Sequence, residues 1–271
     1  MSRRNKWNKD DCIDSILSIA DKIGETPSWK LYHEHKTDEQ PSGSTIQDRC
    51  GSWSNALELA ELKSRPPAHT PINVDYFKNI DTPEKAYWLG LIYADGYVAF
   101  TNDTNKFIIS LSSKDGYLLE QMLEDFESEH TLQHIEREDT SDMVSVTIAY
   151  RPFVAHLNKH GLDQDKTYSD SLPDLESDSL RGAFVRGMFD GDGWVGKYQL
   201  KITGSSEKRW KHLGTWLPCK SDIYKSNRKS GNVELYIPSD SQSQFFHFIY
   251  SEGIDTSPKL ERKFATFRAN L

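Results

Sequence analysis

Trp88-Leu89-Gly90-Leu91-Ile92-Tyr93-Ala94-Asp95-Gly96 is an apolar stretch that ends in Asp-Gly, and the chain repeats its pattern later. The second copy is Val185-Arg186-Gly187-Met188-Phe189-Asp190-Gly191-Asp192-Gly193. Each apolar run predicts a helix, and its final glycine is the expected left-handed residue that ends the helix. Both copies then pass into a strand-like pair of an aromatic residue and valine.

Small residues recur four positions apart in both copies, as Gly90 with Ala94 and Gly187 with Gly191. A helix face made of small residues lets two backbones approach closely. We therefore expect the two helices to pack against each other.

This packing would bring the carboxylates of Asp95 and Asp192 together at one end of the helix pair. A carboxylate at the negative pole of a helix is disfavoured by about 0.3–1 kcal/mol, and two side by side are worse. A cation between them resolves the conflict, and hard oxygen ligands favour Mg²⁺. The competing interpretation is a core helix followed by a common Asp-Gly turn. The matching second copy weighs against it.

The segments that follow each copy also match in order. After the first copy the pattern predicts strands 97–100 and 107–112, helix 116–126, strands 132–137 and 144–150, and helix 152–160. After the second it predicts strands 194–195, 198–203, 223–228 and 233–237 with helices 207–217 and 241–251. The prediction is an α+β fold: two α-β-β-α-β-β-α units related by a pseudo-twofold axis, at residues 66–173 and 174–271.

A small all-helical module is expected before these units, in residues 1–65. Helical spacing covers residues 11–23, with Gly24 as its end, and Ser28, Ser44 and Ser52 are candidate caps of three further helices. The proline-containing stretch 63–71 reads as a linker.

The two repeated stretches resemble the motif of the LAGLIDADG homing endonucleases, with Tyr93 where an acid is usual. The resemblance covers roughly residues 72–271 and implies site-specific cleavage of both DNA strands. It implies that Asp95 and Asp192 are metal ligands and catalytic acids for Mg²⁺ or another divalent cation such as Mn²⁺. Backbone carbonyls of Ala94 and Gly191 would complete the ligand set.

The family also implies a basic residue beside each scissile phosphate. Lys166 and Lys259 occupy equivalent places after Gly161 and Gly253. Arg262 or Lys263 remain alternatives to Lys259.

The helical module, residues 9 to about 62, holds a second resemblance, to the homing-endonuclease-associated repeat. The residues that show this resemblance are Thr26-Pro27-Ser28, Pro41-Ser42 and the run Gly51-Ser52-Trp53-Ser54-Asn55-Ala56-Leu57. Cys50 stands where an aromatic residue is usual. The implied role is an accessory DNA contact, and a packing appendage is the equally open alternative.

Two sheets built from such units would read duplex DNA in the major groove, where base edges carry a full donor and acceptor code. Alternation places one polar set on a strand face, opposite Tyr198, Leu200 and Ile202: Lys197, Gln199, Lys201 and Thr203. A predicted hairpin end adds Lys225, Asn227, Arg228 and Lys229. Weaker candidates in the first unit are Ser110, Ser112, Arg137, Ser145 and Thr147. A solvated strand face is the alternative for each.

The net charge of −8 runs against a simple DNA-binding protein, which presents a basic face. Its distribution softens the conflict: residues 1–65 carry 10 basic and 11 acidic side chains (−1), residues 66–173 carry 8 and 18 (−10), and residues 174–271 carry 15 and 12 (+3). Much of the acid falls in 120–129, a predicted outer helix. Acid behind a sheet leaves its front free to bind DNA.

We expect an intracellular, cytoplasmic monomer with an internal pseudo-dimer, without a membrane segment or a small-molecule cofactor. Three scattered cysteines suggest a reducing compartment and no zinc site. The second functional hypothesis is a sequence-specific DNA-binding protein that does not cleave, acting as a regulator or an intron-splicing helper. Loss of one acid would favour it, and both Asp95 and Asp192 are present.

Overall fold

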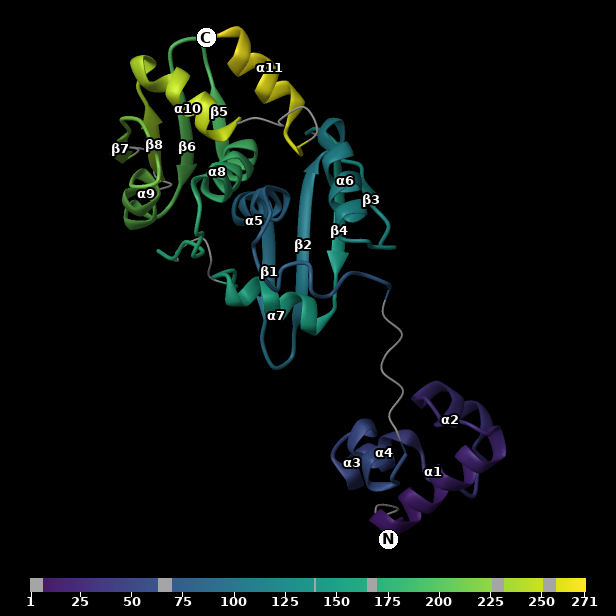
Figure 1. Cartoon of the computed structure of the whole chain (residues 1–271). Helices are drawn as coiled ribbons and strands as arrows, with labels where there is room; N and C mark the ends of the chain where they lie inside the picture. The colour runs from purple at the N-terminus through teal and green to yellow at the C-terminus, as the bar shows by residue number, and fades with distance from the viewer. Residues whose placement is uncertain (1–6, 63–69, 139, 165–169, 226–231, 251–256) are drawn as a thin grey trace. The chain divides into compact units, whose positions relative to one another are not determined.

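The computed structural model describes residues 7–62, 70–138, 140–164, 170–225, 232–250 and 257–271. The chain divides into two compact units, one ending at His69 and one beginning at Thr70 (Figure 1). Most of the predicted linker, residues 63–69, lies outside the described residues.

The N-terminal unit is all-helical, as predicted. Its helices are α1 (Lys9–Ile23), α2 (Trp29–His35), α3 (Gly43–Cys50) and α4 (Trp53–Leu59). Gly24 ends α1 with φ 74°, and the hydroxyls of Ser28 and Ser52 cap α2 and α4. The predicted cap of α3 was wrong: Ser42 accepts the N–H of Thr45, and Ser44 lies inside the helix.

A small core holds this unit together around Tyr32, whose side chain is fully buried. Its hydroxyl lies 2.7 Å from Ser15 Oγ on α1 and donates to the carbonyl of Pro41 at 2.8 Å. One phenol therefore ties α1, α2 and the segment before α3 together.

Tyr32→Phe is expected to lower the free energy of unfolding of the N-terminal unit by about 1–3 kcal/mol, because it leaves the buried polar groups of Ser15 and Pro41 without this partner. Thermal unfolding followed by circular dichroism on the full chain measures the effect. Tyr97→Phe is the control, since Tyr97 is 40% exposed and belongs to the other unit. Equal melting of both variants and the wild type would contradict the role given to Tyr32.

The C-terminal unit contains the predicted duplication. The first half consists of α5 (Pro83–Asp95), β1 (Gly96–Phe100), β2 (Asn105–Ser112), the short 3₁₀ turn η2 (Ser113–Asp115), α6 (Tyr117–Asp125), β3 (Gln133–Ile135), β4 (Met143–Ile148) and α7 (Arg151–Lys159). The second half consists of α8 (Asp178–Asp192), β5 (Gly193–Val195), β6 (Leu200–Gly204), α9 (Glu207–Gly214), β7 (Asp222–Lys225), β8 (Val233–Ile237), η3 (Ser239–Ser241), α10 (Gln242–Ile249) and α11 (Glu261–Ala269). The antiparallel sheets have the same strand order, β1-β2-β4-β3 and β5-β6-β8-β7.

The motif helices α5 and α8 lie side by side at the centre of this unit, with one sheet beyond each (Figure 1). Each begins at a hydroxyl cap, Thr82 for α5 and Ser177 for α8. Their contact is as close as the small residues predict. A Cβ added to Gly90 would overlap the carbonyl oxygen of Phe184, and one added to Gly187 would lie 2.6 Å from the amide nitrogen of Leu91.

The predicted left-handed ends of the two motif helices were wrong. Gly96 has φ −77° and ψ 152°, and Gly193 has φ −81° and ψ 150°, so both are extended and start a strand directly. Glycine is required there because of space. A Cβ on Gly96 would lie 2.7 Å from the carbonyl oxygen of Ile92, and one on Gly193 would overlap that of Phe189.

Helix α11 is an element that the predicted repeat unit did not include. It follows the second half and packs Phe267 against Phe189, Phe245 and Phe246. Its nine residues hold few apolar side chains, and the matching segment of the first half gave no reason to expect a further helix. Among the described residues, the second half therefore has one helix more than the first.

One face of each sheet packs on helices and the other faces outward. In β2 the inward side chains Phe107, Ile109 and Leu111 are buried and alternate with half-exposed ones. Strand β6 starts later than predicted, because the Gly196 amide bonds the Gln199 carbonyl and closes a turn. Tyr198, predicted on the inward face, lies in that turn and is 69% exposed.

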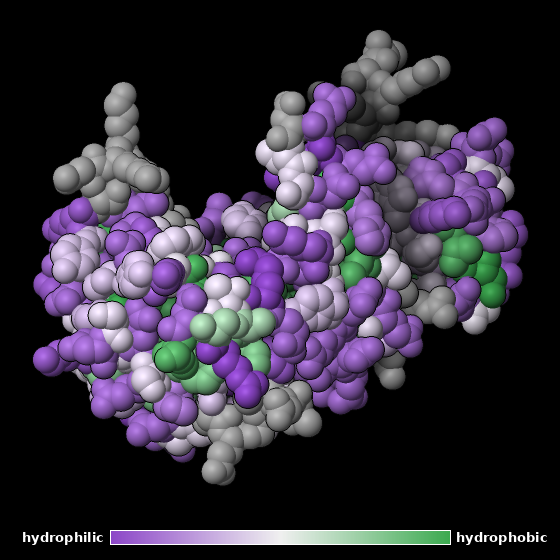
Figure 2. Space-filling model, turned by 90° about the horizontal axis from the view of Figure 1, so that it is seen from above, coloured by the Kyte–Doolittle hydropathy of each residue, from purple (hydrophilic) through white to green (hydrophobic). Residues whose placement is uncertain are grey.

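The face shown in Figure 2 is mainly hydrophilic, with apolar side chains in small separate patches. Within the described ranges, no helix has the length and apolar character needed to cross a membrane.

Candidate active site

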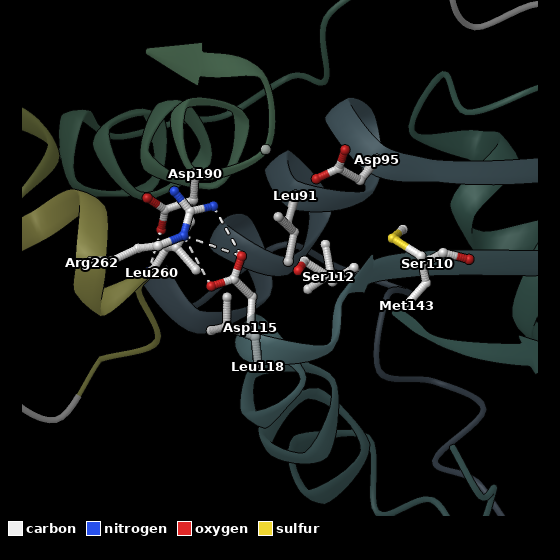
Figure 3. A pocket seen from close by; sticks show the side chains of 12 residues that line it. Leu91, Asp95, Ser110, Ser112, Asp115, Leu118, Met143, Asp190, Leu260 and Arg262 are labelled. Carbon is white, nitrogen blue, oxygen red and sulfur yellow. Dashed lines mark hydrogen bonds and ion pairs between the residues drawn. The ribbon is translucent and has the colours of Figure 1, made fainter. Parts of the chain in front are cut away.

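The motif helices end together, and each ends in an aspartate. Asp95 is the last residue of α5 and Asp192 the last of α8. A Cβ added to Gly191 would lie 2.8 Å from Asp95 Oδ2, so the Asp95 carboxylate rests against the last turn of α8 (Figure 3). The absent side chain of Gly191 is what leaves room for it.

Lys263 of α11 lies at the same place, with only 8% of its side chain exposed. Its ammonium donates to the carbonyl oxygens of Phe189 at 2.8 Å, Asp190 at 2.7 Å and Gly191 at 3.2 Å. A cation is thereby bound to the carbonyls at the negative end of α8, where the helix dipole favours positive charge.

Burial and the nearby carboxylates have opposite effects on the pKa of Lys263. Burial lowers the pKa of its ammonium to about 8, and the carboxylates of Asp190, Asp95 and Asp192 oppose this change. Burial likewise raises the pKa of Asp190 to about 6, against the stabilising Leu260 N–H and the Lys263 charge. The buried Lys263 ammonium therefore lies within the electrostatic influence of three carboxylates.

A pocket of about 210 Å³ opens between the two halves beside this group (Figure 3). Its lining includes Asp95, Asp115, Asp190 and Arg262, with the hydroxyls of Ser110 and Ser112. The Arg262 guanidinium binds both oxygens of Asp115, with Nε 3.0 Å from Oδ1 and Nη2 2.9 Å from Oδ2. This ion pair links α11 to the 3₁₀ turn after β2, and so crosses from one half to the other.

Three basic residues were open candidates in the second half, and the structure separates them. Lys263 contacts the end of α8, Arg262 lines the pocket, and Lys259 pairs with Glu261 at 2.9 Å. Lys259 is buried and its carbonyl accepts the hydroxyl of Tyr117. Lys166 lies outside the described residues.

The side chains present fit a divalent cation of the Mg²⁺ type. Carboxylate oxygens of Asp95 and Asp192 are hard donors, and Mg²⁺ binds to proteins through one or two carboxylates while substrate phosphates and water complete its shell. The space left by Gly191 admits the Asp95 carboxylate beside α8. In the described part of the chain, no three His, Cys, Asp or Glu side chains gather as a metal cage. The predicted Gly191 carbonyl ligand already accepts from Lys263.

The outer face of the first sheet is a nearly uncharged mixture of polar and apolar side chains. None of the outward side chains of strands β1 to β4 is acidic, and Lys106, over the Tyr97 ring, is their single cation. Ser110 and Ser145 share a hydrogen bond of 2.8 Å on adjacent strands, in register with Gln133. The acidic excess of this half therefore lies elsewhere than on the sheet front.

The outer face of the second sheet is aromatic. Trp194 and Tyr224 are 48% and 54% exposed, and Tyr224 meets Tyr236 edge-on with ring centroids 5.7 Å apart. Lys201, a predicted reader, lies over the Trp194 ring and bonds Glu234 at 2.6 Å. Thr203 lies on the same face, opposite Glu234.

The remaining predicted DNA contacts are scattered around the sheet ends. Lys197 and Gln199 belong to the exposed β5–β6 turn, and Arg137 is exposed beyond β3. Lys225 ends β7 and pairs with Glu207 at 2.8 Å. Asn227, Arg228 and Lys229 lie outside the described residues.

Sequence reasoning missed Asp190 and the aromatic outer face. Asp190 stood in the quoted motif as its second acid, and its distance of two residues from Asp192 was the available signal. Of the outward aromatics, Tyr236 alternates with the buried Leu235 and Ile237, a pattern that strand periodicity could have found.

Comparison with known proteins agrees with this architecture. Residues 7–63 match the homing endonuclease associated repeat, and residues 82–160 match the LAGLIDADG-like domain. No curated protein matches the sequence. The chain therefore carries the homing endonuclease associated repeat followed by a LAGLIDADG-like domain.

Solved structures share the fold at low identity. A mesophilic variant of the homing endonuclease I-DmoI is 16% identical, with a TM-score of 0.51, over 73% of this chain and 99% of that one. I-DmoI in complex with DNA and Ca is 17% identical, with a TM-score of 0.50, over 71% and 97%. The N-terminal LAGLIDADG domain of WhiA matches at 17% identity and a TM-score of 0.44, over 71% and 93%.

Proposed function

We propose that the protein is a site-specific endonuclease that hydrolyses both strands of duplex DNA with a divalent cation, Mg²⁺ or Mn²⁺. The observation that supports it best is the shared end of α5 and α8, where the Asp95 carboxylate fits against Gly191 beside Asp192. I-DmoI, which has this fold, has been crystallised with DNA and Ca, and with DNA and Mn.

In this proposal the outer faces of the two sheets bind the duplex and place a phosphate of each strand near the helix ends. Asp95 and Asp192 would hold the cation, which when bound lowers the pKa of coordinated water and offsets charge on the leaving oxygen. Lys263 and Arg262 carry positive charge beside the same place and would stabilise the phosphate as its negative charge grows.

The domain assignment belongs to the same proposal. Residues 1–65 would be an accessory module, and 66–173 and 174–271 two catalytic halves of one monomer. The pseudo-twofold pairing of α5 with α8 supplies internally what two copies would otherwise provide. No small-molecule cofactor takes part.

A DNA-binding protein without nuclease activity is the second candidate. One observation favours it: the Lys263 ammonium already donates to the carbonyl of Gly191, a predicted metal ligand. In that case Lys263 would take the place of a cation at the end of α8.

Cleavage of a randomised duplex library distinguishes the two candidates. With Mg²⁺ the wild type is expected to make discrete double-strand cuts, which EDTA abolishes. Asp95→Asn and Asp192→Asn are each expected to reduce cutting by about 100-fold or more, the size seen when one stabilising group is removed from an active site. Asp178→Asn is the matched control, since this exposed residue lies at the opposite end of α8. Selection of one duplex without a cut under any divalent metal would establish the second candidate instead.

A further inference from the structure

Asp190 is a buried carboxylate next to the proposed site, and the proposed reaction gives it no role. Its side chain is 3% exposed. One oxygen, Oδ2, accepts the hydroxyl of Tyr87 at 3.0 Å and the backbone N–H of Leu260 at 2.7 Å. Burial of a carboxylate is costly, so this arrangement requires an explanation.

The bond to Leu260 fixes the place where α11 begins. Leu260 directly precedes α11, and Lys263 lies in the first turn of that helix. Asp190 therefore holds the start of α11, and Lys263 returns from α11 to the carbonyls of Phe189, Asp190 and Gly191. Two contacts therefore join the end of α8 to the start of α11. The Asp190 carboxylate lies at the positive N-terminus of α11, and the Lys263 ammonium lies at the negative C-terminus of α8, so each charge has the sign that the helix dipole favours.

The first half contains a related contact at the matching position. Tyr93, two residues before Asp95, donates its hydroxyl to the carbonyl of His160 at 2.6 Å. A Cβ on Gly161 would lie 2.6 Å from that hydroxyl, so the turn closes tightly on Tyr93. In both halves the residue two places before the terminal aspartate therefore bonds to a later segment of its own half. Tyr93 bonds to the turn after α7, and Asp190 bonds to the start of α11.

We propose that Asp190 is a positioning residue, which fixes the first turn of α11 and thereby holds the Lys263 ammonium beside Asp95 and Asp192. Its effect on catalysis rests on the proposed function, whereas its effect on the placement of Lys263 does not. A carboxylate that served packing alone would have no reason to accept the N–H at the start of the helix that carries this cation.

The placement of Lys263 can be measured without any nuclease activity. Amine acetylation of the full chain, resolved by mass spectrometry at each lysine, reports how often the ammonium leaves its buried position. In the wild type Lys263 is expected to react far more slowly than the exposed Lys208. Asp190→Ala is expected to raise its rate about tenfold, because the loss of a hydrogen bond to a charged group shifts local opening by that order. Asp190→Leu, which fills more of the space, replaces the alanine variant if that variant does not fold.

Two controls separate positioning from general loosening. Tyr87→Phe removes the other partner of Asp190 Oδ2 and retains the Leu260 bond, so the Lys263 rate should stay within twofold or so of the wild type. Asp125→Asn weakens a partly buried carboxylate bonded to Trp88 in the first half, and should leave Lys263 unchanged. An unchanged Lys263 rate in folded Asp190→Ala, or an equal rise in both controls, overturns the proposal.

Cleavage kinetics then test the catalytic consequence. Asp190→Ala is expected to lower kcat by about tenfold or more, the effect of removing a group that orients an active-site residue, with KM for DNA unchanged. Asp190→Asn keeps an oxygen acceptor for Leu260 and should recover part of kcat. If the wild type cuts no DNA, the proposed function fails while the acetylation result still decides the placement of Lys263.

Discussion

Replacing Gly187 with alanine is expected to lower the free energy of unfolding of the C-terminal unit by about 4 kcal/mol or more, one of the largest losses that a single substitution produces. The added methyl group would overlap the Tyr87 carbonyl oxygen and lie 2.6 Å from the Leu91 amide nitrogen. Both are backbone atoms of α5 and cannot rotate away, so the two central helices must separate. All contacts of α5 with α8 are then weakened together.

Thermal unfolding of the full chain measures this effect. For a unit of this size about 4 kcal/mol corresponds to a fall in Tm of about 8–16 °C. Gly214→Ala is the matched control, because it also lies in a helix but its Cβ would meet just the Ser221 hydroxyl, at 3.3 Å. Gly214→Ala is expected to change stability by less than about 1 kcal/mol, with either sign. Similar melting of the two variants would show that the helices do not meet through their backbones.

Lys263→Met is expected to have the second-largest effect on stability, a loss of about 3–5 kcal/mol, because it removes a buried charge that favours the ionised form of the buried Asp190 carboxylate. Asp190 would stay buried with Arg186 as its remaining buried cationic neighbour, and three carbonyl oxygens at the end of α8 would lose their donor. Methionine retains most of the volume of the side chain, so the loss reports charge and hydrogen bonding more than packing. Denaturant unfolding at neutral pH measures the loss.

Lys259→Met is the control, because Lys259 is equally buried but pairs with Glu261, which is 61% exposed. Glu261 stays in contact with water when its partner is removed, so the loss should be smaller than for Lys263, about 0–1 kcal/mol. Adding Asp190→Asn to Lys263→Met should restore about 1 kcal/mol or more, since the pair is coupled. Additive losses in the double variant would mean that the two charges do not interact.

The central helix pair could be predicted because its determinants are local and repeated. Gly90, Gly187 and the two Asp-Gly ends are visible in the sequence, and a helical period places them on one face. The similar spacing of later segments then predicted the duplicated sheet. Both features can be predicted from the spacing of residues along the chain. The strand order of the two sheets agrees with the predicted duplication.

The surroundings of the aspartates could not be predicted in the same way. Lys263 meets α8 across more than 70 residues of sequence, and α11 exists where the first half offered no counterpart to suggest it. The sequence pattern predicted left-handed caps at Gly96 and Gly193. Glycine is instead required there because a side chain would collide with the preceding turn of the helix. Contacts between distant segments decided the places of Lys263 and α11, and no local pattern encodes them.

The nearly uncharged outer face of the first sheet has a consequence for how such a protein changes over evolutionary time. Thr147 and Gln133 project away from the core, so a new side chain there alters the outer face without disturbing packing. The paired glycines of α5 and α8 permit no such freedom. We therefore expect substitutions to accumulate on the outer face of the first sheet over evolutionary time, while the glycines that join α5 and α8 stay unchanged.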